Sequence, residues 1–135
     1  DIVMEAGNRA SSPLGTEVLS LDSLAPLSTG DDVATHPLVP FAATSAAAAQ
    51  AARLAAQISA AHPGLWPETI RALVVHSAEW TPHMKAQLLA ANGKTAKYPL
   101  LRRFGHGVPD FARASASATN HLALIANSAI SNGQG

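Results

Sequence analysis

One segment limits the folds open to this chain more than any other, the alanine-rich stretch at residues 44–62, TSAAAAQAARLAAQISAAH. Alanine is the best helix former, so the segment predicts a long helix, which Pro63 and Gly64 end. Gln50, Arg53 and Gln57 recur at helical spacing as one polar stripe. Small and aliphatic side chains form the opposite face: Ala47, Ala51, Leu54, Ala55 and Ile58. A helix that is apolar almost all round is usually buried in a larger protein.

Charge and composition exclude several classes of function. The 135 residues carry nine basic and nine acidic side chains, so no overall field attracts nucleic acid or an anionic membrane. Arg102 and Arg103 form too small a basic patch for nucleic acid. No apolar run reaches the roughly 18 residues that a membrane span needs. Because cysteine is absent, the chain holds no disulfide, thiolate zinc site, cysteine nucleophile or iron–sulfur cluster.

The order of apolar runs and turn residues predicts a mostly helical chain with few strands. Ile2, Val3 and Met4 form an apolar run closed by Gly7 and Asn8, which predicts a buried strand entering a turn. Residues 9–40 are rich in Ser, Pro, Gly, Thr and Asp, and predict a long excursion with one short strand near residues 17–21.

Shorter helices are expected after the alanine-rich one. Pro67 and Glu68 suit the first turn of a helix that runs to residue 78. The remaining expectations follow in chain order: a short helix at residues 82–91, a polar loop at 92–100, a turn at 105–107, a helix from Pro109 and Asp110 to residue 115, and a strand at 121–130, where a helix also fits.

Thr44 and Ser45 open the long helix, and a serine there has two physical uses. Its hydroxyl can cap the helix by accepting a hydrogen bond from a free backbone N–H. It can also act as a nucleophile, because the free N–H groups and the positive end of the helix dipole stabilise an oxyanion. Taken alone, the residues favour the cap, because capping serines are common.

Four segments together resemble the subtilisin-like serine peptidases, the subtilases, in that family's order. The family's nucleophile pattern is Gly-Thr-Ser-x-Ala, which Thr44, Ser45 and Ala47 match, while Ala43 replaces the glycine and Ala49 stands where many members have proline. The other three segments are DIVMEAG at residues 1–7, HPGLWPETIRAL at residues 62–73 and FGHGVPD at residues 104–110. The resemblance covers most of residues 1–135.

The resemblance implies an α/β fold, with residues 1–135 as the C-terminal part of a catalytic domain. The complete domain would hold a mostly parallel sheet flanked by helices, and this segment would be predominantly helical. Ser45 would be the nucleophile of peptide-bond hydrolysis through an acyl-enzyme, and its own N–H would be one oxyanion donor. Thr44 and Ala43 would line the leaving-group side of the cleft. The substrate would be a polypeptide.

The family's order of residues places the rest of the catalytic machinery outside this chain. Its members carry Asp, then His, then the oxyanion Asn, then Ser, so the first three are expected upstream of Asp1. We therefore expect a piece of a longer protein that needs the N-terminal part of the same catalytic domain as its partner. Alone it should have little or no peptidase activity.

Other polar residues near Ser45 have weaker claims to a role. Asn8 follows Ala-Gly as the family's oxyanion asparagine does, but its place after the first strand aligns it with a later segment. His36 as the base would break the family's order. Asp31 and Asp32 could ligate calcium in the full-length family fold, but adjacent carboxylates in such a loop are more often solvated. No metal or cofactor is expected in this chain.

A second hypothesis belongs to a different class. The chain would be a non-catalytic helical interaction module or a pseudo-peptidase, in which Ser45 only caps its helix. The alanine-rich helix would then bury itself against a partner chain.

Overall fold

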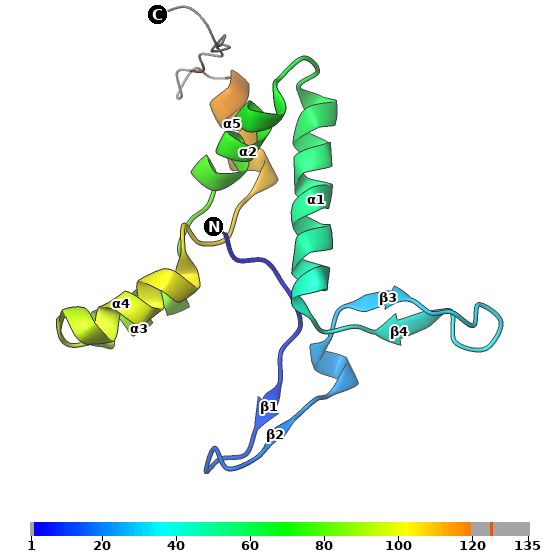
Figure 1. The fold of residues 1–135 in the computed structure, drawn as a ribbon, viewed down its shortest axis with the longest axis vertical. Helices are drawn as coiled ribbons and strands as arrows, with labels where there is room; N and C mark the ends of the chain where they lie inside the picture. The colour runs from blue at the N-terminus through cyan, green and yellow to red at the C-terminus, as the bar shows by residue number, and fades with distance from the viewer. Residues whose placement is uncertain (1, 120–124, 126–135) are drawn as a thin grey trace, which may run out of the picture. The chain divides into compact units, whose positions relative to one another are not determined.

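The computed structural model describes residues 2–119 and residue 125, in two compact units (Figure 1). Residues Met4–Ala52 form one unit, and the second consists of the residues before Met4 and those from Arg53 onward. In chain order the elements are β1 (Ala10–Ser11), β2 (Val18–Leu19), a 3-10 helix (Asp22–Leu24), β3 (Leu27–Thr29), β4 (Leu38–Pro40), α1 (Thr44–Ala61), α2 (Pro67–His76), α3 (Pro82–Ala90), α4 (Gly93–Phe104) and α5 (Phe111–Thr119). The strand expected at 121–130 lies outside the described residues, apart from Ile125.

The described residues are predominantly helical with two small sheets, so the chain is a mixed α and β segment. Both sheets have two antiparallel strands, β1 with β2 and β3 with β4. The short strand predicted near residues 17–21 is confirmed by β2. No described helix is long and apolar enough to cross a membrane.

The strand predicted at Ile2, Val3 and Met4 is not formed. No second strand among the described residues pairs with this segment, although the Val3 N–H donates to the carbonyl of Gly107 over 2.8 Å. Ile2 is half-buried against the hydrophobic core. The prediction of a strand here is therefore wrong, because the run lacks the paired neighbour that a sheet requires.

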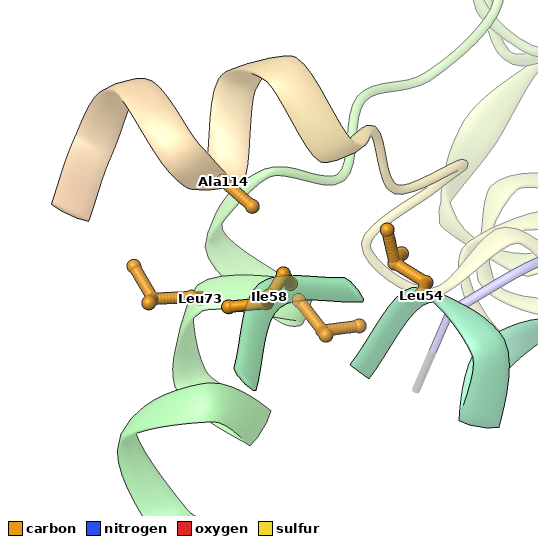
Figure 2. Packing of buried hydrophobic residues seen from close by; sticks show 5 residues of the cluster. Leu54, Ile58, Leu73 and Ala114 are labelled. Atoms are coloured by element: carbon orange, nitrogen blue, oxygen red, sulfur yellow. The ribbon is translucent and has the colours of Figure 1, made fainter. Parts of the chain in front are cut away.

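The core of the second unit lies where α1, α2 and α5 meet (Figure 2). Its buried members are Leu54, Ile58, Leu73, Val74 and Ala114. Ile58 is completely buried, and the small side chain of Ala114 faces the cluster from α5. The predicted helices at 44–62, 67–78 and 82–91 are confirmed as α1, α2 and α3, and Pro67 occupies the first turn of α2 as expected.

The polar loop predicted at residues 92–100 is wrong, because α4 runs through it. Pro99 lies inside this helix, and a proline there usually argues against one, since it removes a backbone hydrogen bond. A tertiary contact outweighs that cost. Phe104, the last residue of α4, is buried and meets Trp80 edge to face, with ring centroids 5.9 Å apart. The Trp80 indole N–H also donates to the Gly105 carbonyl over 2.9 Å.

An antiparallel bridge between Glu79 and Val108 joins the end of α2 to the turn before α5. Their backbones exchange hydrogen bonds of 3.0 and 2.8 Å. Gly107 has a φ of +101° here, and a β-carbon on it would overlap the Glu79 carbonyl. Asp110 then caps α5 by accepting from the Arg113 N–H over 2.9 Å, so the helix begins at Phe111, close to the predicted start.

Gly107→Ala should destabilise the second unit strongly, because it adds both a positive-φ strain and an overlap with backbone. We expect the free energy of unfolding to fall by about 3 kcal/mol. Gly64→Ala is the matched control, since its φ is also positive, +94°, but nothing lies within 4 Å of the added carbon. Thermal unfolding should show a far larger drop in Tm for Gly107→Ala. Equal drops would show that backbone strain alone accounts for the effect.

Candidate functional site

Ser45 is the second residue of α1, and its side chain is exposed. The helix already begins at Thr44, so Ser45 does not stand at the capping position. The described residues offer its hydroxyl no hydrogen-bond partner. The hydroxyl is therefore free at the start of an 18-residue helix.

The backbone N–H of Ser45 is unpaired within the described residues, at the positive end of α1. Ala46 donates its N–H to the carbonyl of Ala43 over 2.9 Å, while the N–H of Ser45 makes no such bond within the described chain. Ala43 and Thr44 are exposed beside it. Unpaired N–H groups and the helix dipole both favour negative charge at this point. The arrangement is able to stabilise an oxyanion formed next to Ser45.

The segment around Glu5 and Gly7 lies against the first turns of α1. Gln50 donates from its side-chain amide to the Glu5 carbonyl over 2.8 Å. Gly7 adopts a φ of +84°, and a β-carbon placed on it would lie 2.6 Å from the Ala42 side chain. This close approach needs a glycine. From the sequence, Gln50 was assigned only to the polar stripe of the helix. The one feature that could have indicated this contact is its amide side chain in an almost wholly apolar helix.

Asn8 follows this turn, and the described structure shows no hydrogen bond between it and Ser45. Its side-chain oxygen accepts from the Arg9 N–H over 2.8 Å, and its backbone N–H donates to Leu24 over 2.7 Å. Both bonds hold the local loop. The structure thus places Asn8 in the same unit as Ser45 without assembling the two into one site.

His36 and the two adjacent aspartates occupy the loop that joins β3 to β4. Figure 1 shows this loop at the far end of the hairpin, with β4 between it and the start of α1. Asp32 accepts from the N–H groups of Ala34 and Thr35 over 3.1 and 3.2 Å, and from the Thr35 hydroxyl. His36 bonds the same hydroxyl over 2.8 Å through Nδ1. His36 is therefore not paired with Ser45.

No metal site appears in the described part of the chain, where no three His, Asp or Glu side chains lie close enough to share an ion. The carboxylate oxygens of Asp32 accept hydrogen bonds from Ala34 and Thr35 of their own loop. Asp31 is exposed.

The Asp32 loop should loosen in acid. The Thr35 hydroxyl and the Thr35 and Ala34 N–H groups stabilise the charged carboxylate, so the pKa of Asp32 lies below its ordinary value of 3.8. A lowered folded-state pKa adds stability that is present above the ordinary value and lost as pH falls through the folded pKa. The amide resonances of Ala34 and Thr35 should move toward random-coil positions below pH 3.8. Asp32→Ala should cause the same change at neutral pH, and Asp31→Ala should not.

Gln50→Ala should release the Glu5 segment from α1. The lost hydrogen bond costs about 1 kcal/mol, which amide hydrogen exchange in residues 5–8 should register. Gln57→Ala is the matched control on the same helix, because that side chain is exposed and makes no hydrogen bond within the described residues. Equal exchange in both variants would show that the Gln50 bond does not hold this segment.

A family model described as the subtilase family matches residues 1–107, a range that contains Ser45, Gln50 and the Glu5 to Gly7 turn. No curated protein and no solved structure matches the chain. Because the match covers well over half of the 135 residues, the chain belongs to the subtilase family of serine peptidases.

Proposed function

We propose that this chain supplies the nucleophile-bearing part of a subtilisin-type endopeptidase, with Ser45 as the nucleophile. The observation that carries the proposal is the state of Ser45 in a chain of this family. Its hydroxyl is exposed and unbonded, and its N–H is unpaired at the positive end of α1. A nucleophile needs this freedom, whereas a capping serine would be engaged with the helix.

The reaction would be acyl transfer followed by hydrolysis. The Ser45 oxygen attacks the scissile carbonyl while its proton passes to a histidine base, and the carbonyl oxygen becomes an oxyanion. The Ser45 N–H donates to that oxyanion. The histidine then protonates the leaving amine, which leaves an acyl-enzyme on Ser45. Water, deprotonated by the same histidine, releases the acid product. These steps use side chains and backbone amides, and we propose no cofactor.

The histidine and the aspartate that orients it would come from the N-terminal part of the same catalytic domain, outside this chain. No histidine of the described residues bonds Ser45, and His36 lies in the loop between β3 and β4. That part would also supply the mostly parallel sheet. The apolar run at Ile2, Val3 and Met4 pairs with no strand among the described residues and is suited in composition to join such a sheet.

The outer face of α1 also supports a missing part of the domain. It carries only exposed small side chains where an ordinary surface helix carries charged ones: Ala48, Ala49, Ala52, Ala56, Ser59 and Ala60. Small side chains let another element approach closely. We propose that the rest of the catalytic domain covers this face.

Thr44 and Ala43 would line the leaving-group side of the cleft. The methyl group of Ala43 takes the place of the family's glycine and would narrow the space beside the scissile bond. Asn8 remains a weaker proposal as an oxyanion donor, because its side-chain oxygen is engaged with Arg9 while its amide nitrogen is free of described partners. We propose a polypeptide substrate, and neither nucleic acid nor a membrane as a partner.

The competing function is a non-catalytic interaction module or pseudo-peptidase. Its central premise was that Ser45 caps α1, and the free hydroxyl does not favour this. The exposed small face of α1 fits either function, since a separate partner chain could cover it as well.

Labelling with a fluorophosphonate probe tests the proposed nucleophile. The longer protein, extended upstream to include the Asp and His segments, should be labelled at Ser45, as peptide mapping would show. The 135-residue chain alone should be labelled at most weakly, because the general base is missing. Ser45→Ala should abolish labelling of the longer protein.

Ser59→Ala is the matched control, since Ser59 is another exposed serine of α1 and should leave labelling unchanged. A folded longer protein that is not labelled at Ser45 would contradict the nucleophile assignment and favour the interaction module. Labelling at another serine would contradict it as well.

A further inference from the structure

The neutral net charge of the chain conceals two segments of opposite sign. Residues 80–109 contain five of the nine cations and no carboxylate: Lys85, Lys94, Lys97, Arg102 and Arg103. The opposite excess lies in residues 4–40, here called the acidic segment. It holds five carboxylates against the single cation Arg9: Glu5, Glu17, Asp22, Asp31 and Asp32.

Helix α4 gathers three of these cations and two apolar side chains on one face. Its members are Lys94, Lys97, Tyr98, Leu101 and Arg102, here called the basic face of α4. They follow the spacing i, i+3, i+4, i+7 and i+8, which places them on one side of a helix. All are exposed, Tyr98 by 63% and Leu101 by 44%. The Arg102 guanidinium lies 5.8 Å from the centre of the Tyr98 ring.

No carboxylate neutralises this face within the described chain. The single ion pair found there joins Arg113 to Glu79 over 3.7 Å, and neither residue belongs to α4. The face therefore combines unpaired positive charge with exposed aromatic and aliphatic surface. Exposed apolar surface is typical of interaction sites, and a positive potential favours a negatively charged partner.

The acidic segment has the complementary composition. Glu17, Asp22 and Asp31 are exposed, and none of them is ion-paired within the described residues. Large apolar side chains are exposed on the same two hairpins: Leu14, Val18, Leu19, Leu27 and Leu38. Negative charge and apolar surface thus occur together here, as positive charge and apolar surface do on α4.

We propose that the basic face of α4 binds the acidic segment of a second copy of this chain. The two surfaces match in the sign of their charge and both expose apolar side chains, and the partner chemistry is present in the protein itself. An anionic membrane fits less well. A membrane-surface helix separates its apolar face from its cations, whereas the cations of α4 alternate with Tyr98 and Leu101 on one face. The contact joins two different surfaces, so each copy can bind one partner through its basic face and a second partner through its acidic segment.

Sedimentation equilibrium of the 135-residue chain tests this proposal. At low ionic strength the weight-average mass should rise with concentration to about twice the 13.8 kDa of one chain or beyond. In about 0.5 M salt, where charges are screened within roughly 4 Å, it should return to the mass of one chain. Association that salt does not reverse overturns the proposal and points to an apolar contact, such as the outer face of α1.

Charge reversal locates the two surfaces. Lys94→Glu with Lys97→Glu should abolish the association, and so should Glu17→Lys with Asp31→Lys. Combining all four substitutions keeps the net charge at zero and reverses both surfaces together, so the mass should rise again as in the unaltered chain. Each variant's fold is checked by circular dichroism, and none of the four side chains makes a hydrogen bond or ion pair in the described structure.

A matched control separates the basic face from net charge alone. Arg53→Glu with Arg71→Glu makes the same change in net charge on two other exposed helical positions, and association should persist. Equal loss in this control overturns the proposal, as does a fourfold variant that remains a single chain. Tighter binding of the unaltered chain to anionic vesicles than to itself, lost in the Lys94 and Lys97 variant, would assign the face to a membrane instead. None of these results depends on Ser45.

Discussion

The burial of one stripe of α1 is the interaction on which the second unit depends. In the C-terminal half of this helix, Leu54 and Ile58 pack against α2 and α5. The other buried members of the cluster are Leu73, Val74 and Ala114. Few other large apolar side chains are buried among the described residues, so a small number of contacts sets the packing. The N-terminal half of the same helix holds Ser45 free and binds the Glu5 carbonyl through Gln50. Helix α1 therefore contributes both to the hydrophobic core of the second unit and to the candidate site around Ser45.

The small number of buried apolar side chains explains why so much of the described chain is exposed. Alanine gives α1 its helical propensity but offers little area to bury, and no described residue covers the outer face of α1. The apolar run at Ile2, Val3 and Met4 likewise pairs with no strand among the residues that the structure describes. Both features fit a segment of a subtilase domain whose remaining elements would supply the sheet and the catalytic histidine. The charged surfaces on α4 and on the acidic segment do not contribute to the hydrophobic core, because their charged side chains are exposed.

Much of the helical fold could be predicted, since local signals were strong. The alanine-rich run, Pro67 with Glu68, and Asp110 each mark a helix through neighbouring residues. The loop predicted at 92–100 was wrong because it rested on the polar residues of the segment, while burial of Phe104 against Trp80 favours the helix. Within the candidate site, the motif predicted Ser45 as the nucleophile, and this stays a prediction. The contact of Gln50 was not predicted, because its partner is a backbone carbonyl 45 positions away, which leaves no mark in the adjacent sequence.

The sequence by itself determined the family resemblance, the position of Ser45 at the start of a long helix, and the separation of positive and negative charge along the chain. These are local properties, carried by residue type and spacing. Tertiary structure decided that Ser45 is free rather than engaged as a cap, that His36 stands apart from it, and that α4 is a helix with an exposed basic face. The start of α1 at Thr44 leaves the Ser45 hydroxyl unbonded within the described residues, and the turn around Asp32 and Thr35 engages His36 within its own loop. Helix α4 depends on the burial of Phe104 against Trp80, a contact that forms only when the chain is packed.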